Sequence, residues 1–218
     1  MILKADEIAR RIDGPLKDDE EPLIITPMPT STLDGLKGSG NASVDLRLGT
    51  WIVSLRQSRI AKLGVPEDKT TGPGAPPAEE PPGENRLTRQ YYVPFGKSFI
   101  LHPKYFVLGV TLEWIRLPKD VAGYVIGKSS WGRHGLIIAT AVGVHPGFAG
   151  CLTLELSNVG ELPLELKPGM QICQLFLHGA KSESGEESKS GFVGQRKPRL
   201  GSVKGDEVAK KLIEAYRT

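Results

Sequence analysis

Glu155 is the residue whose place in the sequence says most about chemistry. It lies in the segment 150–158, where leucines alternate with more polar residues, so we expect a strand with one apolar face. The leucines are Leu152, Leu154 and Leu156, and the other face carries Cys151, Thr153, Glu155 and Ser157. A carboxylate beside hydroxyl groups can move protons on a bound substrate. The alternative is a solvated glutamate on the wet face of an antiparallel strand.

The stretch 127–133 supplies hydroxyl and cationic groups upstream of this strand. Ser129 and Arg133 are four residues apart, so one helical turn after a strand ending at Ile126 would place both on one face. With Glu155 they could form a site for proton transfer on a negatively charged substrate. A serine that opens a helical turn is equally explained as a helix cap.

Three other chemistries find little support in the sequence. The segment 123–129 has three residues between its glycines where a phosphate-binding P-loop needs four. The four histidines, at 102, 134, 145 and 178, have no metal-ligand spacing, and no Cys-x-x-Cys occurs, so we expect no zinc site. A Gly-x-Ser-x-Gly elbow for acyl transfer is also absent from the sequence.

Composition predicts a single domain built mainly from short strands. The 218 residues include 26 glycines and 17 prolines, and the net charge of +3 is too small to indicate a nucleic-acid partner. The two cysteines, Cys151 and Cys173, sit in apolar strand-like runs, so we expect reduced, buried thiols. Residues 1–7 lack an apolar signal core, and no run reaches the roughly 18 apolar residues of a membrane span, so we expect a cytoplasmic protein without a membrane partner.

The order of elements favours an all-β barrel or sandwich. An amphipathic helix is expected at 4–13 and another helix at about 205–216, with a strand at 51–55. Seven short apolar runs separated by Gly and Pro predict further strands at 98–102, 105–115, 121–126, 136–141, 151–157, 162–166 and 171–177. We expect a mobile Pro/Gly-rich insertion at about 57–88 and a mobile C-terminal tail at about 181–218, within one domain over 1–218.

Taken together, several motifs resemble the dCTP deaminase branch of the dUTPase-like superfamily, over nearly the whole chain except the insertion. The matching stretches are ASVDLRLG at 42–49, VLGVTLE at 107–113, GKSSWGRHGL at 127–136, TA at 140–141, PGFAGCLTLELSN at 146–158, PGM at 168–170, QL at 174–175 and GQR at 194–196. The resemblance implies a distorted β-barrel of the dUTPase-like (β-clip) type with short terminal helices. It also implies a homotrimer with active sites between subunits.

The same resemblance implies an enzyme that deaminates dCTP to dUTP and ammonia without a protein-bound metal, with Mg²⁺ carried on the triphosphate. Glu155 would be the proton shuttle, and Ser129 and Arg133 would hold the water and the reacting end of the base. The expected substrate contacts are Lys128, Ser130, Thr140, Ala141, His145, Phe148, Gln174 and Gln195, with Gln195 in the closing tail. Whether dTTP inhibits the enzyme stays open.

His145 departs from the family pattern, because aspartate usually precedes Pro-Gly-Phe at this place. That aspartate lies near the deoxyribose and helps activate water in enzymes that hydrolyse dUTP, so His145 argues against diphosphatase activity. The alternatives are a dUTP diphosphatase, a bifunctional enzyme that makes dUMP, a non-catalytic nucleotide-binding protein, or a deaminase for another cytosine nucleotide.

Overall fold

The computed structural model describes residues 1–30, 33–56, 87–139, 143–180 and 194–201, with single positions at 208 and 211. The chain divides into two compact units: Met1–Ser54 with Gln90–Arg199, and Leu55–Arg89 with Leu200–Thr218. Most of the expected insertion, the tail segment 181–193 and most of the expected helix at 205–216 lie outside the described residues. The single domain over 1–218 therefore stays a prediction, and the account below concerns the first unit.

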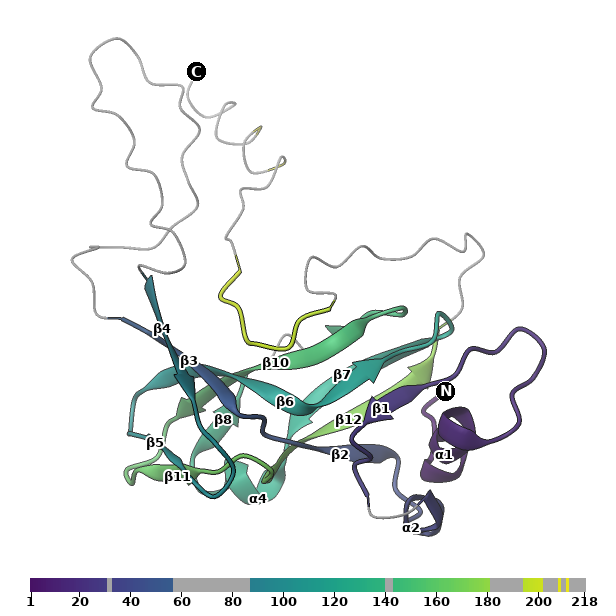
Figure 1. Cartoon of the computed structure of the whole chain (residues 1–218), viewed down its shortest axis with the longest axis horizontal. Helices are drawn as coiled ribbons and strands as arrows, with labels where there is room; N and C mark the ends of the chain where they lie inside the picture. Colours follow the sequence, from purple (N-terminus) through teal and green to yellow (C-terminus); the bar gives the residue numbers. More distant parts are fainter. Residues whose placement is uncertain are drawn as a thin grey trace. The chain divides into compact units, whose positions relative to one another are not determined.

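The described elements are mainly strands, as predicted (Figure 1). In chain order they are α1 (Ala5–Asp13), β1 (Ile24–Thr26), α2 (Leu33–Gly38), β2 (Ser43–Arg47), β3 (Trp51–Leu55), β4 (Thr88–Tyr92), β5 (Phe99–Leu101), β6 (Phe106–Arg116), β7 (Val121–Gly127), α4 (Ser129–Gly132), β8 (Leu136–Ile138), β9 (Gly143–Val144), β10 (Ala149–Asn158), β11 (Leu164–Leu166) and β12 (Gln171–Gly179). The helix predicted at 4–13 and all seven later strands are confirmed to within a few residues. The two-residue strand β9 was not predicted, because it is too short to show a period.

Three sheets organise these strands. A six-stranded sheet has the order β4-β3-β6-β10-β8 with β1 also paired to β6, a four-stranded sheet has the order β2-β12-β7-β9, and β11 pairs with β5. The mainly β fold expected from the sequence is confirmed. In the described part of the chain the sheets are separately hydrogen-bonded, so they form a distorted sandwich and not one closed barrel.

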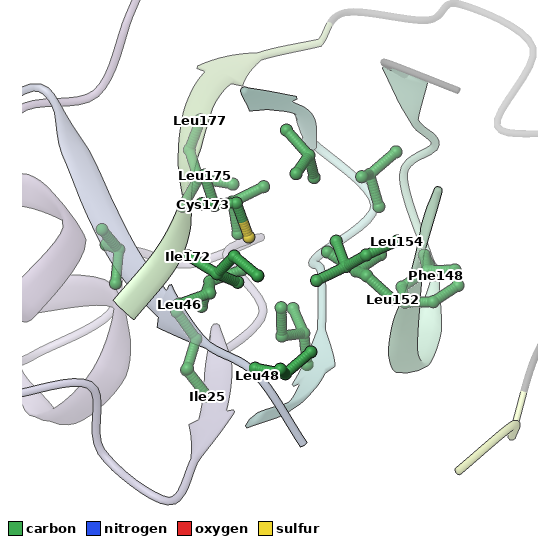
Figure 2. Close-up of a cluster of buried hydrophobic side chains, with 14 of the residues drawn as sticks. Ile25, Leu46, Leu48, Phe148, Leu152, Leu154, Ile172, Cys173, Leu175 and Leu177 are labelled. Carbon is green, nitrogen blue, oxygen red and sulfur yellow. The ribbon is translucent and has the colours of Figure 1, made fainter. Parts of the chain in front are cut away.

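The apolar face of β10 packs into the core between the two larger sheets. Leu154 and Leu156 have no exposed surface and Leu152 is 7% exposed, and they cluster with buried residues of β2 and β12. Figure 2 shows Leu152 and Leu154 on one side of this cluster and Leu46 and Ile172, from the other sheet, on the opposite side. Each buried leucine stabilises the fold by roughly 2 kcal/mol. A one-residue slip would expose all three, so this burial fixes which side chains of β10 face outward.

A buried carboxylate links the two larger sheets. Glu113 of β6 is fully buried, and its Oε2 accepts a 2.9 Å hydrogen bond from the backbone N–H of Arg47 on β2. Its Oε1 lies 3.4 Å from Arg47 Nε and has no hydrogen-bond partner. Burial raises the pKa of the Glu113 carboxyl, and the nearby backbone hydrogen bonds and Arg47 only partly oppose it. The folded protein therefore favours the neutral acid more strongly than the unfolded chain does.

Glu113→Gln is expected to make stability less dependent on pH. Because the folded-state pKa of Glu113 is raised, its contribution is full below the ordinary value of 4.5 and is lost as the pH rises through the folded value. The melting temperature of Glu113→Gln relative to that of the parent should therefore rise between pH 4 and pH 8. Glu113→Leu also removes the acceptor for Arg47 N–H and should cost about 1–3 kcal/mol at pH 4, with a smaller deficit at pH 8 for the same reason. Thermal unfolding across pH measures both, and a Gln variant whose deficit grows with pH would contradict this account.

Candidate active site

Glu155 lies in a row of side chains that crosses the six-stranded sheet. Its register partner on β6 is Leu108, and the partner of Leu108 on β3 is Val53. Directly opposed residues of antiparallel strands point to the same face, with Cβ atoms about 4.5–5.5 Å apart. Leu108 and Val53 are 5% and 3% exposed, and Glu155 is half-buried. The predicted polar face of β10 is thus confirmed, and its carboxylate borders a buried apolar strip.

On the other side of β10 runs the short strand β8. Its pairing with β10 ends at Ile138 opposite Leu156, and the next residue, Ala139, donates its N–H to the Glu155 carbonyl at 2.9 Å. Thr140 and Ala141, predicted to contact the substrate, follow Ala139 and lie outside the described residues.

Ser129 begins the helical turn α4 and Arg133 is its C-cap, so the turn on which the shared face of these two residues depended is present. The Arg133 N–H donates to the Ser129 carbonyl at 3.0 Å, and both residues are exposed. The helix cap is Lys128, with no side-chain capping bond, so Ser129 is not the cap residue and that alternative is wrong. Two contacts anchor the turn to the start of β12: Lys128 N–H to Ile172 O at 3.1 Å, and Trp131 Nε1 to Gln171 O at 3.1 Å.

The turn α4 and Glu155 lie at opposite ends of β8. Residue Leu136, which follows the turn, pairs with Asn158, whereas Ala139 at the far end bonds to Glu155. Three residues of strand span roughly 10 Å. The Ser129 and Arg133 side chains are therefore offset along the strand from Glu155 of the same chain.

Lys128, predicted to contact phosphate, takes part in a polar cluster on the outer face of the four-stranded sheet. Its Nζ lies 2.6 Å from Asp45 Oδ2 and 3.3 Å from Gln171 Oε1. Gln174, also predicted to contact substrate, donates to Asp45 Oδ1 at 3.1 Å. The sequence analysis did not single out Asp45, although its alternation with Leu46 in the strand pattern indicates that it faces away from the core.

His145 and Phe148 belong to the turn between β9 and β10 and face different surroundings. The His145 side chain is exposed, and its carbonyl accepts the Phe148 N–H at 3.2 Å to close the turn. Phe148 is 9% exposed and packs in the hydrophobic core. A substrate contact by Phe148 remains a prediction, and in this structure its ring is a core residue (Figure 2).

The tail residues 194–196 run beside the first residues of β10. The Gly194 N–H donates to Ala149 O at 2.6 Å, and the Cys151 N–H donates to Gln195 O at 2.8 Å. Gln195 Oε1 is buried without a hydrogen-bond partner. Arg196 lines a cavity of about 560 Å³ together with Trp51, Trp114 and Cys151. Cys151 and Glu155 lie on one face of β10, so cavity and carboxylate are roughly 13 Å apart along the strand.

Both cysteines are free thiols, as expected, but they differ in exposure. Cys173 is fully buried, and burial raises its pKa to about 12. Cys151 is only half-buried, which corrects the expectation of two buried thiols: it faces the cavity, opposite the leucine face of β10.

Within the described ranges, no three His, Cys, Asp or Glu residues gather closely enough to hold a metal ion. No described helix is long and apolar enough to span a bilayer.

In class, this is a mainly β protein with a glutamate on the outer face of β10 and an exposed turn that carries Ser129 and Arg133. The chain belongs to the dCTP deaminase-like family, whose sequence model matches residues 2–180.

Relatives support this assignment along almost the whole chain. The dCTP deaminase of Natronomonas pharaonis is 35% identical over 211 residues, covering 94% of this chain and 96% of the relative. A dUMP-forming dCTP deaminase of Dictyoglomus thermophilum is 38% identical over 183 residues, covering 84% and 82%. Among solved structures, the 2'-deoxycytidine 5'-triphosphate deaminase of Agrobacterium tumefaciens matches with a TM-score of 0.45 and 24% identity, over 66% of this chain and 40% of that one.

Proposed function

We propose that this protein is a hydrolase that deaminates dCTP to dUTP and ammonia, acting on the C–N bond of a cyclic amidine. The observation that carries the proposal is the place of Glu155, half-buried beside Leu108 on the outer face of β10, in a chain of the dCTP deaminase-like family. A relative named dCTP deaminase covers 94% of this chain, which supports the same reaction here.

Glu155 serves as the proton shuttle of the proposed mechanism. Its carboxylate takes a proton from water as the water oxygen adds to C4 of cytosine, and passes that proton to N3. The hydroxyl proton of the tetrahedral adduct then returns through Glu155 to the exocyclic amine. The C4–N4 bond breaks, ammonia leaves, and C4 keeps the oxygen as the carbonyl of uracil. The apolar strip of Leu108 and Val53 keeps competing water from one side of this carboxylate.

The exposed turn supplies the polar groups that hold substrate. Ser129 and Arg133 hold the attacking water and the reacting end of the base, where they stabilise the adduct. Lys128 and Ser130 bind the triphosphate, which carries Mg²⁺ as part of the substrate. Thr140 and Ala141 line the base pocket, and His145 lies toward the sugar, with Phe148 of the same turn packed in the core. Gln174 supports the phosphate end, and Gln195 closes the site with the tail.

The enzyme acts as a homotrimer whose active sites lie between subunits. The offset between α4 and Glu155 along β8 supports this, because a neighbouring copy can bring its own Ser129 and Arg133 to Glu155. An apolar hollow on the outer face of the four-stranded sheet also supports it. Ile2, Tyr124 and Ile126 are 57%, 47% and 50% exposed there, and a second copy would cover them. We also propose that dTTP binds at the same site as an inhibitor, which measurements of dTTP binding would test.

A bifunctional enzyme that forms dUMP is the second candidate. Relatives named dUMP-forming dCTP deaminases, such as that of Dictyoglomus thermophilum, favour it. The exposed His145 argues against it, since the family's aspartate at this position contributes to water activation.

Glu155→Gln is expected to lower the kcat of ammonia release from Mg-dCTP by about a thousandfold, because no other carboxylate is assigned to the proton transfer. Affinity for dCTP should change little. Glu161→Gln, an exposed site, is the matched control and should keep parental turnover. Equal turnover by Glu155→Gln and the parent would remove Glu155 from the mechanism.

Mixing two inactive variants tests whether the site is shared between subunits. Glu155→Gln and Arg133→Ala, denatured and refolded together in equal amounts, should regain about a quarter of the parental activity, since a ring of three copies pairs an intact Glu155 with an intact Arg133 at one interface in four. Each variant refolded alone should stay inactive. No recovery, with normal trimers by sedimentation, would place the site within one chain.

His145→Asp is expected to add pyrophosphate release from dUTP, about tenfold or more above the parent, because a carboxylate near the sugar can activate water. Product masses from dCTP and dUTP distinguish the outcomes. A parent protein that already makes dUMP at the rate of deamination would favour the bifunctional candidate instead.

A further inference from the structure

The ammonium of Lys128 is held in place by the protein itself. Asp45 Oδ2 lies 2.6 Å and Gln171 Oε1 3.3 Å from Lys128 Nζ. The side chains of Lys128 and Asp45 are 22% and 29% exposed, so the pair lies at the surface without being fully solvated. An ammonium has three N–H donors, and these two contacts use two of them.

Asp45 is in turn fixed from the neighbouring strand. Gln174 of β12 is the register partner of Asp45 on β2, and its Nε2 donates to Asp45 Oδ1 at 3.1 Å and to Ser43 Oγ at 3.4 Å. On its other side Gln174 pairs with Ile126 of β7, two residues before Lys128. The chain Ser43–Gln174–Asp45–Lys128 therefore crosses three adjacent strands and ends at the cap of α4.

We propose that Asp45 is a positioning residue for the triphosphate, acting through Lys128, and that Gln174 acts through Asp45. This inference rests on the proposed function and deepens it, because it concerns how the phosphate end of dCTP is recognised. A free lysine side chain must lose much rotational freedom when it binds a phosphate. Holding its ammonium beforehand removes most of that cost, and preorganisation of this kind appears as affinity.

A carboxylate beside a phosphate site also repels the ligand, so the direction of the effect decides between two roles. If Asp45 mainly orients Lys128, its loss weakens binding. If Asp45 mainly competes with phosphate for the ammonium, its loss strengthens binding. The bonds from Gln174 and Ser43 favour the first role, because they keep the carboxylate fixed beside Lys128.

The test is a double-mutant cycle with Asp45→Asn, Lys128→Gln and the double variant, using the full chain. We expect Asp45→Asn to raise the KM for Mg-dCTP about tenfold, as loss of a charge-assisted hydrogen bond does, with kcat within about threefold of the parent. In the Lys128→Gln background, Asp45→Asn should change KM less than twofold, because its effect passes through the missing ammonium. Gln174→Met should shift KM in the same direction by a smaller factor.

Controls separate this inference from folding and from the proposed function. Asp34→Asn neutralises a carboxylate that is 96% exposed and should leave both constants unchanged. The same double-mutant cycle can be measured in the Glu155→Gln background as the Kd of Mg-dCTP by calorimetry. This measurement needs no turnover, so it tests the role of Asp45 even if the parent protein releases no ammonia. Equal effects of Asp45→Asn with and without Lys128, or a lower KM or Kd, would overturn the proposal. If Asp45→Asn lowered only kcat, because a smaller fraction of the protein is folded and active, the proposal would also be overturned.

Discussion

Burial of the three leucines of β10 is the constraint on which the proposed site depends. Because Leu152, Leu154 and Leu156 pack against the opposite sheet, the intervening residues must face outward, and Glu155 cannot turn inward without exposing the core. The same register sets Glu155 beside Leu108 and brings Ala139 to its other side. A core contact thus decides the surroundings of a polar side chain on the far face of the strand.

Two acidic residues near β2, Glu113 and Asp45, have different surroundings. Glu113 is fully buried, its burial raises the pKa of its carboxyl, and its Oε2 accepts the Arg47 N–H between β6 and β2. Asp45, on the outer face of β2, keeps its carboxylate near water and next to Lys128. Both acids contact β2 or belong to it, and they differ in burial: Glu113 has no exposed surface, whereas the side chain of Asp45 is 29% exposed.

The strand pattern could be predicted from the sequence because period-two alternation and Gly/Pro breaks are local signals, as in β6, β10 and β12. The spacing of Ser129 and Arg133 fits the helical turn at 129–132 but does not by itself predict it. Sheet pairing could not be predicted, because the sequence does not record that Leu108 opposes Glu155 or that Gln174 opposes Asp45. The sequence also did not show the packing of Phe148: its motif predicted a contact with substrate, whereas in the structure its ring packs in the core.

Gly150 shows how a short motif can encode a distant contact. It adopts φ 155°, and a Cβ at this position would lie 3.3 Å from both the backbone N and the backbone O of Gln195. In the sequence it reads as the end of a tight Pro-Gly-Phe-Ala-Gly bend. In the folded chain the missing side chain of Gly150 lets the tail segment 194–196 pack closely against β10. Even alanine at this position would push the two backbones apart.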